Sequence, residues 1–161
     1  MNQQTQILKL NSAALKQIKK WKTSHMKIGF TNGCFDILHP GHISLLRQAK
    51  KTCDRLVVGL NSDASVSRLK GPNRPIQNEL ARATLLIAFE DVDAIIIFEE
   101  DTPQKILELV CPNVLIKGAD YKLDEVIGGD FVKNMGGEVI LAAIEEGHST
   151  SNLIKQMIKK E

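Results

Sequence analysis

The sequence predicts an α/β fold: a single Rossmann-like, doubly wound parallel sheet of five strands with helices on both faces. Short apolar runs rich in Val, Ile and Leu alternate with longer helical patterns along most of the chain. The runs are continuously apolar, which is typical of parallel strands covered on both faces, whereas an antiparallel sandwich favours alternation. The regular succession of strand and helix indicates βαβ crossovers.

Each strand is predicted from a run of β-favouring residues, and most of the helices from the pattern that follows a strand. The strands are expected at 26–31, 56–60, 94–98, 114–117 and 138–141. The helices are expected at 41–52, 61–69, 78–90, 102–110, 124–134 and 150–160. Thr102 and Pro103 fit a helix N-cap followed by proline at the first helical position. Loops that contain Gly or Pro are expected at 69–75, 128–129 and 136–137.

Composition limits the classes of protein to which this chain can belong. With 161 residues it can bury a core without disulfides or a structural metal. Its three cysteines form no C-x-x-C pair, which disfavours a disulfide framework or a zinc-finger site and favours reduced thiols in the cytoplasm. No apolar run approaches the roughly 18 residues of a membrane span, and no signal peptide is recognisable. We therefore expect a cytoplasmic protein without a membrane partner.

Residues 1–25 differ in charge from residues 26–161 and are interpreted as a basic N-terminal helix or arm. Six lysines and no acidic residue fall within residues 1–27, which leaves 15 basic against 19 acidic residues in the remainder. Apolar residues recur here at near-helical spacing, which favours a helix docked by its apolar face. They are Leu8, Leu10, Leu15, Ile18 and Trp21. Contact with nucleic acid or an anionic membrane is the alternative for this arm.

The segment after the first strand combines two histidines with two glycines. Residues 31–42 read Thr-Asn-Gly-Cys-Phe-Asp-Ile-Leu-His-Pro-Gly-His and lead directly into a predicted helix. Gly33 and Gly41 allow the backbone to approach a ligand closely, and the free N–H groups at the helix start favour an anion. His39 and His42 at such a start suit hydrogen bonds to phosphate oxygens as charge develops. A metal-binding pair and plain turn chemistry are the alternatives that these residues leave open.

The segment 30–42 resembles the H-x-G-H signature of the cytidylyltransferase-like nucleotidyltransferases. The similarity extends over residues 28–158 and is closest to the adenylyltransferase domain of ADP-heptose synthases. Its further matches are 58–66, 68–71, 74–75, 82, 98–103, 117–121, 136–139 and 149–152. The Asn-Gly-Cys-Phe-Asp start together with Lys-Gly-Ala-Asp-Tyr at 117–121 is specific to the heptose branch. His148 departs from the Cys or branched apolar residue more usual there, which puts local packing in doubt and not the reaction.

The resemblance implies a set of functional residues within a nucleotidyltransferase domain at 26–161. The catalytic residues implied are His39, His42 and Lys70. The nucleotide-binding residues implied are Thr31, Asn32, Gly33, Cys34, Phe35, Gly41, Arg82, Gly118, Asp120, Tyr121, Ser149 and Thr150. The substrate-binding residues implied are Asp36, Asn61, Asp63 and Arg74. No dedicated metal ligand is assigned, because Mg²⁺ is expected to arrive with ATP, held by phosphate oxygens and water.

The chemistry of some of these residues also supports other interpretations. Lys70 and Arg74 lie in a loop of the kind that closes over phosphates, although ordinary solvation also explains Lys70. Arg82 begins an apolar helix, where it is either a bidentate phosphate ligand or a surface charge. Asp36 and Asp63 are interpreted mainly as structural hydrogen-bond acceptors, because a sugar phosphate is already a charged nucleophile and needs no general base.

The activity implied by the resemblance is adenylyl transfer from ATP to D-glycero-β-D-manno-heptose 1-phosphate, which yields ADP-heptose and pyrophosphate. A separate sugar kinase would supply the acceptor, and the product would enter lipopolysaccharide or another surface glycan. The resemblance also implies a homodimer and no nucleic-acid partner. The alternatives are a CTP-dependent cytidylyltransferase of a polyol phosphate such as glycerol 3-phosphate, and a non-catalytic nucleotide or nucleic-acid binding module that uses the lysine-rich arm.

Overall fold

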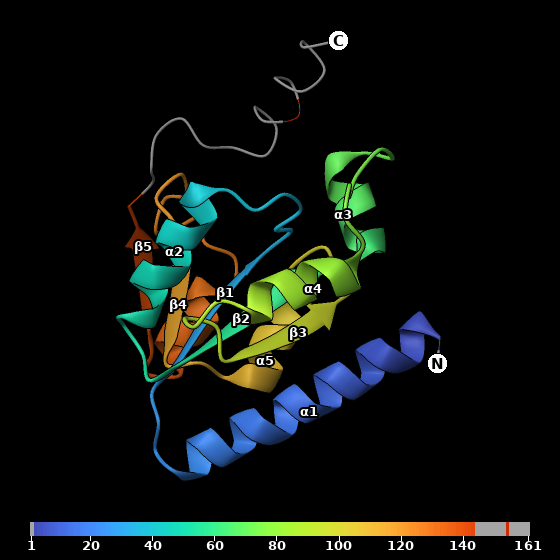
Figure 1. The fold of residues 1–161 in the computed structure, drawn as a ribbon. Helices are drawn as coiled ribbons and strands as arrows, with labels where there is room; N and C mark the ends of the chain where they lie inside the picture. The colour runs from blue at the N-terminus through green and yellow to red at the C-terminus, as the bar shows by residue number, and fades with distance from the viewer. Residues whose placement is uncertain (1, 144–153, 155–161) are drawn as a thin grey trace.

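A computed structural model describes residues 2–143 and residue 154. Six helices and five strands lie within this range, and they alternate except that α4 follows α3 directly (Figure 1). In chain order they are α1 (Gln3–Thr23), β1 (Ile28–Gly33), α2 (Pro40–Lys50), β2 (Arg55–Asn61), α3 (Asp63–Lys70), α4 (Glu79–Ile87), β3 (Ala94–Phe98), α5 (Gln104–Val110), β4 (Val114–Gly118), α6 (Gly129–Asn134) and β5 (Glu138–Ala142). None of these helices is long and apolar enough to cross a membrane.

The strands form one five-stranded sheet in the order β3-β2-β1-β4-β5, and all four neighbouring pairs are parallel. The predicted doubly wound α/β fold is therefore confirmed, and every predicted strand is present. The chain builds outward from β1 through β2 to β3, then crosses back to place β4 on the other side of β1. The strand order thus reverses between β1 and β4, the position where ligands bind in open α/β sheets.

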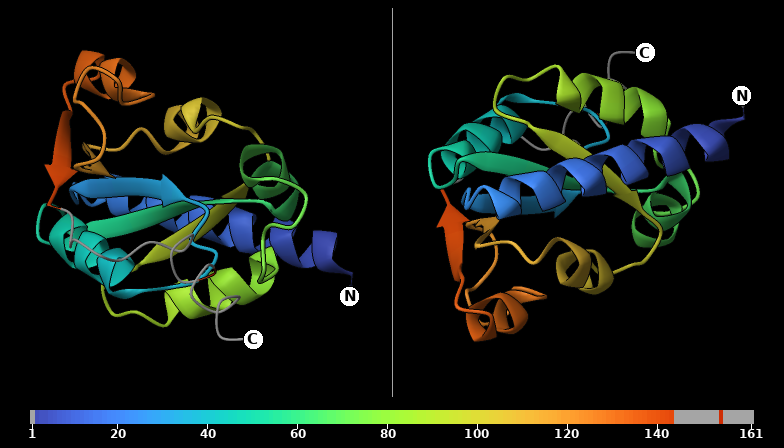
Figure 2. Two further views of the ribbon diagram at one scale, coloured as in Figure 1. Left: turned by 90° about the horizontal axis from the view of Figure 1, so that it is seen from above. Right: turned by 90° about the horizontal axis from the view of Figure 1, so that it is seen from below.

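Two apolar layers enclose the sheet, one on each face. Helices α2 and α4 cover one face, where Leu46 and Leu86 pack against Leu56 and Val58 of β2. Helices α5 and α6 cover the other (Figure 2), and there Leu107 packs in the same cluster as Val57. Successive residues of β2 therefore enter opposite layers, as strand geometry requires, and this explains why the strand is apolar throughout.

Helix α1 runs along β3, the edge strand of the sheet (Figure 1). The Asn11 side chain donates to the Ile97 carbonyl at 2.7 Å and accepts from the Ile97 amide at 2.9 Å, so it occupies part of the open ladder of β3. Ile18 and Trp21 are buried on the same helix. The prediction of a helix docked by its apolar face is confirmed, and α1 protects an edge that would otherwise be exposed to pairing with another chain.

Replacing Ile18 with alanine is expected to lower the free energy of unfolding by about 2–5 kcal/mol, the usual cost of truncating a buried aliphatic side chain. Ile18 is only 2% exposed and packs in the cluster that contains Phe30 and Ile96. Urea unfolding followed by circular dichroism measures the change. Lys16→Ala, on the exposed side of the same helix, is the control and should change stability by less than about 0.5 kcal/mol. Equal stabilities for the two variants would contradict the docked arrangement.

Each predicted helix within residues 2–143 begins one to five residues away from its predicted start, and two of these differences are informative. Helix α5 begins at Gln104 with Pro103 at the N-cap, so the predicted N-cap at Thr102 is wrong by one residue. Helix α6 begins only at Gly129, five residues later than predicted, because Gly128 has a φ of 83° that interrupts the helix. A Cβ at Gly128 would also lie 2.1 Å from Leu107. Of the predicted helix at 150–160, only Ile154 is among the described residues.

Candidate active site

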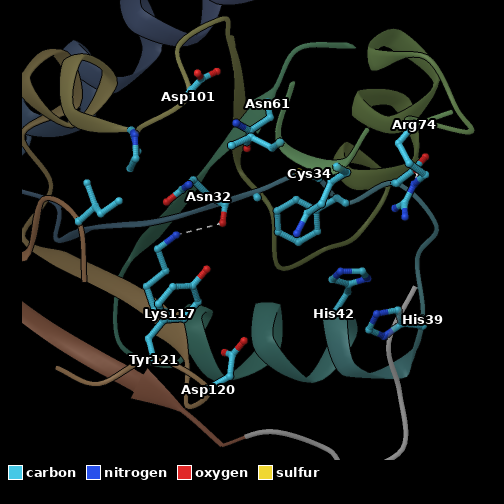
Figure 3. Close-up of a pocket in the computed structure, with 17 residues that line it drawn as sticks. Asn32, Cys34, His39, His42, Asn61, Arg74, Asp101, Lys117, Asp120 and Tyr121 are labelled. Carbon is cyan, nitrogen blue, oxygen red and sulfur yellow. Dashed lines mark hydrogen bonds and ion pairs between the residues drawn. The ribbon is translucent and has the colours of Figure 1, made fainter. Parts of the chain in front are cut away.

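Two connected cavities open at the carboxyl ends of the strands, around the point where the strand order reverses. The large cavity has a volume of about 570 Å³ and the small cavity about 170 Å³. Both are lined by the end of β1, the loop that follows it and the segment after β4 (Figure 3). The residues that the two cavities share are Asn32, Gly33, Cys34, Phe35, His42, Lys117, Asp120 and Tyr121.

The signature loop, residues 34–39, carries the chain from β1 to the start of α2. His39 is the N-cap residue with an extended backbone, and Pro40 fills the first helical position, where no amide hydrogen is needed. The His39 and His42 rings stack with centroids 3.8 Å apart, and Phe35 lies 5.1 Å from His42. Proline and the aromatic contacts thus fix both imidazoles at a helix N-terminus, where the unpaired amides and the helix dipole favour an anion.

Burial lowers the pKa of His42 to about 4, and the neighbouring His39 contributes to the same shift. The imidazole is therefore neutral at physiological pH and carries one N–H donor. Its Nδ1 atom is buried and has no hydrogen-bond partner among the described residues. A neutral, fixed and partly desolvated donor of this kind suits a phosphate oxygen whose negative charge increases during reaction.

The shifted pKa of His42 predicts a loss of stability on mild acidification. The unfolded chain takes up a proton at this residue near pH 6.5, whereas the native protein resists protonation down to about pH 4. Between these values the proton favours the unfolded state, so stability falls as the pH falls. From pH 6.5 to pH 5 the wild type should lose about 1–2 kcal/mol more than His42→Asn, as measured by urea unfolding. Parallel pH profiles for the two proteins would contradict the buried neutral imidazole.

Asp36 joins the signature loop to the loop between α3 and α4. Its carboxylate accepts from Arg74 Nε at 2.5 Å, from the Ile76 amide at 2.8 Å and from the Gln77 amide at 3.0 Å. Burial raises the pKa of Asp36, but these hydrogen bonds outweigh burial, so its pKa lies below the usual value. Asp36 lines the large cavity, yet its oxygens are occupied by protein donors. The geometry therefore favours the structural role of Asp36 over the predicted substrate contact. Asp36 also holds the Arg74 side chain at the cavity.

Arg82 lies behind the cavities and lines neither of them. Its guanidinium is 1% exposed and donates to the carbonyls of Cys34, Asn61 and Gln77 and to the Asp63 carboxylate. The predicted contact with a nucleotide phosphate is therefore not supported, because these protein acceptors already use most of its donors. Arg82 instead holds together the ends of β1 and β2, and Asp63 is paired with it rather than directed at the substrate.

The segment after β4 forms the opposite wall of both cavities. Gly118 lets the Asp120 carboxylate lie close to the end of β4, because a Cβ at this position would lie 2.8 Å from Asp120 Oδ1. Asp120 and Tyr121 follow in a turn closed by a hydrogen bond from the Tyr121 amide to the Gly118 carbonyl. The structure thus brings Gly118, Asp120 and Tyr121 to the small cavity, together with Thr31 and the signature loop.

The remaining predicted residues are only partly brought together. Asn61 and Lys70 line the large cavity, Lys70 as an exposed side chain at the end of α3. Gly41 lies in the first turn of α2 and lines neither cavity. Ser149 and Thr150 lie outside the described residues, as does His148.

Sequence reasoning missed five residues that line the large cavity: Leu69, Asp101, Pro103, Lys117 and Ile127. Asp101 and Pro103 follow β3 in the matched segment 98–103, and Lys117 is the last strand residue before Gly118. Their position at the carboxyl ends of strands was the available signal. A lysine at the end of an apolar run is also typical of a strand end exposed to solvent. Only the assembled sheet shows that Lys117 faces a cavity.

A cation carried by the substrate fits this site better than one held by the protein alone. No three His, Cys, Asp or Glu side chains are grouped to hold a metal ion within the part of the chain that the structure describes. The large cavity nevertheless contains carboxylates, at Asp36, Asp101 and Asp120, beside basic groups. Phosphate oxygens and water satisfy hard cations such as Mg²⁺ without an all-protein cage.

A doubly wound sheet with two stacked histidines at a helix start, basic side chains and a small cavity beside them defines a nucleotide-binding site of the nucleotidyltransferase class. Residues 30–156 match the cytidylyltransferase-like family. The chain belongs to this family.

Individual proteins show the same relationship. The bifunctional protein HldE of Paramagnetospirillum magneticum is 56% identical over 146 residues, which cover 91% of this chain and 30% of that protein. HldE of Nitrobacter hamburgensis is 57% identical over 141 residues, which cover 88% of this chain and 29% of that protein. The sequence thus spans less than a third of these curated relatives. The crystal structure of a lipopolysaccharide core biosynthesis protein from Thermoplasma volcanium is 32% identical, with a TM-score of 0.61, over 76% of this chain and 99% of that one.

Proposed function

We propose that this protein transfers the adenylyl group of ATP to D-glycero-β-D-manno-heptose 1-phosphate and releases pyrophosphate and ADP-heptose. The observation that carries the proposal is the stacked His39–His42 pair at the start of α2, on a cavity that Lys70 and Arg74 also line. Support also comes from the match to cytidylyltransferase-like proteins and from relatives more than half identical over most of this chain. The Lys-Gly-Ala-Asp-Tyr segment disfavours the rival with CTP and a polyol phosphate.

The reaction proposed is a single in-line displacement at the α-phosphorus of ATP. An oxygen of the sugar 1-phosphate forms the new O–P bond while the bond from the α-phosphorus to the bridging oxygen breaks. That bonding pair leaves with pyrophosphate, and no proton has to be removed from the nucleophile. His42 donates to a non-bridging oxygen of the α-phosphate, where negative charge increases, and the α2 N-terminus holds the same group. Lys70 and Arg74 attract the other phosphates, so catalysis consists of positioning and charge stabilisation.

The nucleoside is assigned to the small cavity. Thr31 and the signature loop line one side of it, and Gly118 and Asp120 the other. The Asp120 carboxylate accepts hydrogen bonds from hydroxyl groups, which ribose offers as a pair. Mg²⁺ is the divalent cation proposed, and when bound to ATP it neutralises part of the charge that the pyrophosphate carries away. Asp101 also lines the large cavity, and although Arg68 donates to its Oδ1 at 2.8 Å, its other oxygen is proposed to contact that cation's water shell.

The acceptor must come from a kinase that phosphorylates the anomeric oxygen of the heptose. A separate kinase is the prediction from the sequence, yet the relatives named bifunctional are more than three times as long as the part matched here. Our proposal concerns the transferase step alone and holds both for a kinase on a separate chain and for a fused kinase domain. Homodimerisation and a cytoplasmic location complete the proposal.

The deciding experiment measures pyrophosphate release by the purified protein with two substrate pairs. ATP and heptose 1-phosphate with Mg²⁺ should give turnover, whereas omission of any one of these three components should abolish pyrophosphate release. CTP with glycerol 3-phosphate should give less than a hundredth of that rate. Equal or faster turnover with the second pair would replace the proposed substrates with those of the cytidylyltransferase rival.

The non-catalytic rival assigns the main activity to the lysines of α1. Because Ile18 and Trp21 of this helix are buried, deletion of residues 1–25 would expose the core and cannot separate the two hypotheses. Replacing the exposed lysines Lys9, Lys16 and Lys20 with glutamine removes the charge and leaves the apolar face intact. The enzyme hypothesis predicts unchanged turnover for this triple variant, while the binding-module hypothesis predicts loss of its nucleic-acid binding.

A further inference from the structure

Lys117 is a basic residue of the cavities to which the reaction outlined above assigns no role. It is the fourth residue of β4, and its Nζ atom lies 3.4 Å from the Asn32 carbonyl, a long hydrogen bond, and 5.6 Å from the centre of the Tyr121 ring. No carboxylate forms an ion pair with it among the residues that the structure describes. A desolvated ammonium without an anion is costly, and such a site favours an anionic ligand.

The other basic side chains near the cavities are differently placed. Arg74 is paired with Asp36, and Arg82 is paired with Asp63 behind the cavities. Lys70 lies on the exposed end of α3. Burial lowers the pKa of Lys117 to about 8, with Asp120 opposing this effect. Lys117 is thus a partly buried cation beside the cavities that forms no ion pair among the described residues.

The two cavities separate the groups that each substrate would contact. Residues found only in the small cavity, such as Thr31, Leu45 and Gly118, surround the space assigned to the nucleoside. Residues found only in the large cavity include Asn61, Asp101 and Ile127, which extend away from that space. Lys117 lines both, and Figure 3 shows its amine directed toward Asn32 and away from Asp120. The amine therefore faces the large cavity at its boundary with the nucleoside space.

In-line displacement requires the incoming and leaving groups to lie on opposite sides of the α-phosphorus. Figure 3 places Lys117 on one side of the cavity and Arg74 with the two histidines on the other. The cavity thus offers a separate basic region to each of the two anions, the acceptor phosphate and the pyrophosphate. A desolvated amine suits the acceptor, whose attacking oxygen must lose its water, while the exposed Lys70 suits a product that must leave.

We propose that Lys117 binds the phosphate of the acceptor, in the part of the large cavity bounded by Asn32, Asn61 and Asp101. This assignment rests on the proposed adenylyl transfer and extends it by locating the second substrate. The Asn32 Oδ1 atom is buried and has no partner among the described residues, so it offers an acceptor to a sugar hydroxyl. Asp101 is half exposed and accepts from Arg68 at Oδ1, so its other carboxylate oxygen offers a second acceptor on the far side.

The test compares Lys117→Met with Lys117→Arg and the wild type. The methionine variant keeps the length of the side chain and removes its charge. We expect it to raise the KM for heptose 1-phosphate by about 10- to 100-fold, the effect of losing a charge-assisted hydrogen bond. Its affinity for a non-hydrolysable ATP analogue, measured by calorimetry, should change by less than about threefold. Lys122→Met, an exposed lysine in the following loop, is the matched control and should leave both values unchanged.

The pH dependence distinguishes a phosphate contact from a structural role. The lysine loses its proton above about pH 8 in the free protein, so kcat/KM for the acceptor should fall above that pH in the wild type. Lys117→Arg stays protonated and should recover most of the affinity, with no fall between pH 8 and pH 9. The titratable groups that face Lys117 are Cys34, His42, Asp101, Asp120 and Tyr121. Burial raises the pKa of the Cys34 thiol above its usual value of 9.0, beyond this window.

Three results would overturn the assignment. The first is a loss of ATP-analogue affinity in Lys117→Met as large as its loss of acceptor affinity. The second is an unchanged KM for the acceptor in Lys117→Met. The third is a fall in kcat/KM above pH 8 in Lys117→Arg that matches the fall in the wild type. If the wild type shows no turnover with heptose 1-phosphate, the proposed function fails while the role of Lys117 is still tested. Inorganic phosphate is then titrated into the protein saturated with the ATP analogue. Binding at least tenfold weaker in Lys117→Met supports the assignment, whereas equal binding, or none in the wild type, contradicts it.

Discussion

Replacing His42 with alanine is expected to lower kcat for pyrophosphate release by about 10²–10³-fold, the usual cost of removing one preorganised donor to a developing oxyanion. The His42 ring is stacked on His39, contacts Phe35 and is kept neutral by burial, so its N–H is fixed before substrate arrives. Affinity for an ATP analogue should fall much less, because the donor matters most when charge accumulates in the transition state. Initial rates at saturating ATP and acceptor measure the effect.

The control for this variant is His25→Asn. His25 is exposed in the turn between α1 and β1, and its φ of 57° is one that asparagine tolerates. Its kcat should equal that of the wild type within about twofold. Thermal unfolding of both variants excludes a loss of fold as the cause. A folded His42→Ala protein with wild-type kcat would eliminate the charge-stabilising role of the histidine pair.

Replacing Arg82 with methionine is expected to lower the free energy of unfolding by about 3–5 kcal/mol, the cost of breaking a buried charged network from one side. The side chain is 1% exposed, and its loss leaves the Cys34 and Asn61 carbonyls without their donor and Asp63 without its partner. For a chain of 161 residues this corresponds to a fall in Tm of about 10 °C. Differential scanning calorimetry at pH 7.5 measures it.

The matched control is Arg47→Met on the exposed side of α2, which should shift Tm by less than about 2 °C. The result also decides between the two interpretations of Arg82. If the arginine contacts a nucleotide phosphate, as the sequence alone predicts, the variant should keep its Tm and show a higher KM for ATP. A lower Tm, with the ATP KM measured below the transition and changed little, indicates the packing role seen in the structure.

Much of the fold could be predicted because its signals are local. The apolar runs at 56–60 and 94–98 lie within β2 and β3, and the spacing of Ile18 and Trp21 correctly predicts a docked helix. Strand propensity and helical periodicity depend on neighbouring residues, which the sequence displays directly. The start of helix α6 was harder to predict, because no local pattern shows that the chain adopts a left-handed conformation at Gly128.

The sequence predicted the arrangement of side chains where one continuous segment builds it, but not where distant segments meet. The stacked histidines come from residues 39–42, so their spacing alone brings them together. Arg82 and Asp36 are different, because they bond to segments distant in the chain: Arg74 lies 38 residues from Asp36, and Cys34 lies 48 residues from Arg82. A motif shows that a residue belongs near a site, but it does not show whether that residue faces the ligand or supports the backbone that does.

The amino-acid sequence alone was enough to predict the α/β class, the five strands, the docked basic helix and the histidine pair at the start of α2. The tertiary structure decided which charges that site presents. Folding pairs Arg74 with Asp36 and buries Arg82 among backbone carbonyls, yet it leaves Lys117 facing a cavity without a carboxylate within ion-pairing distance among the described residues. The physical reason is that the pairing of a charge depends on distances between elements, which are fixed only when the sheet and its helices assemble.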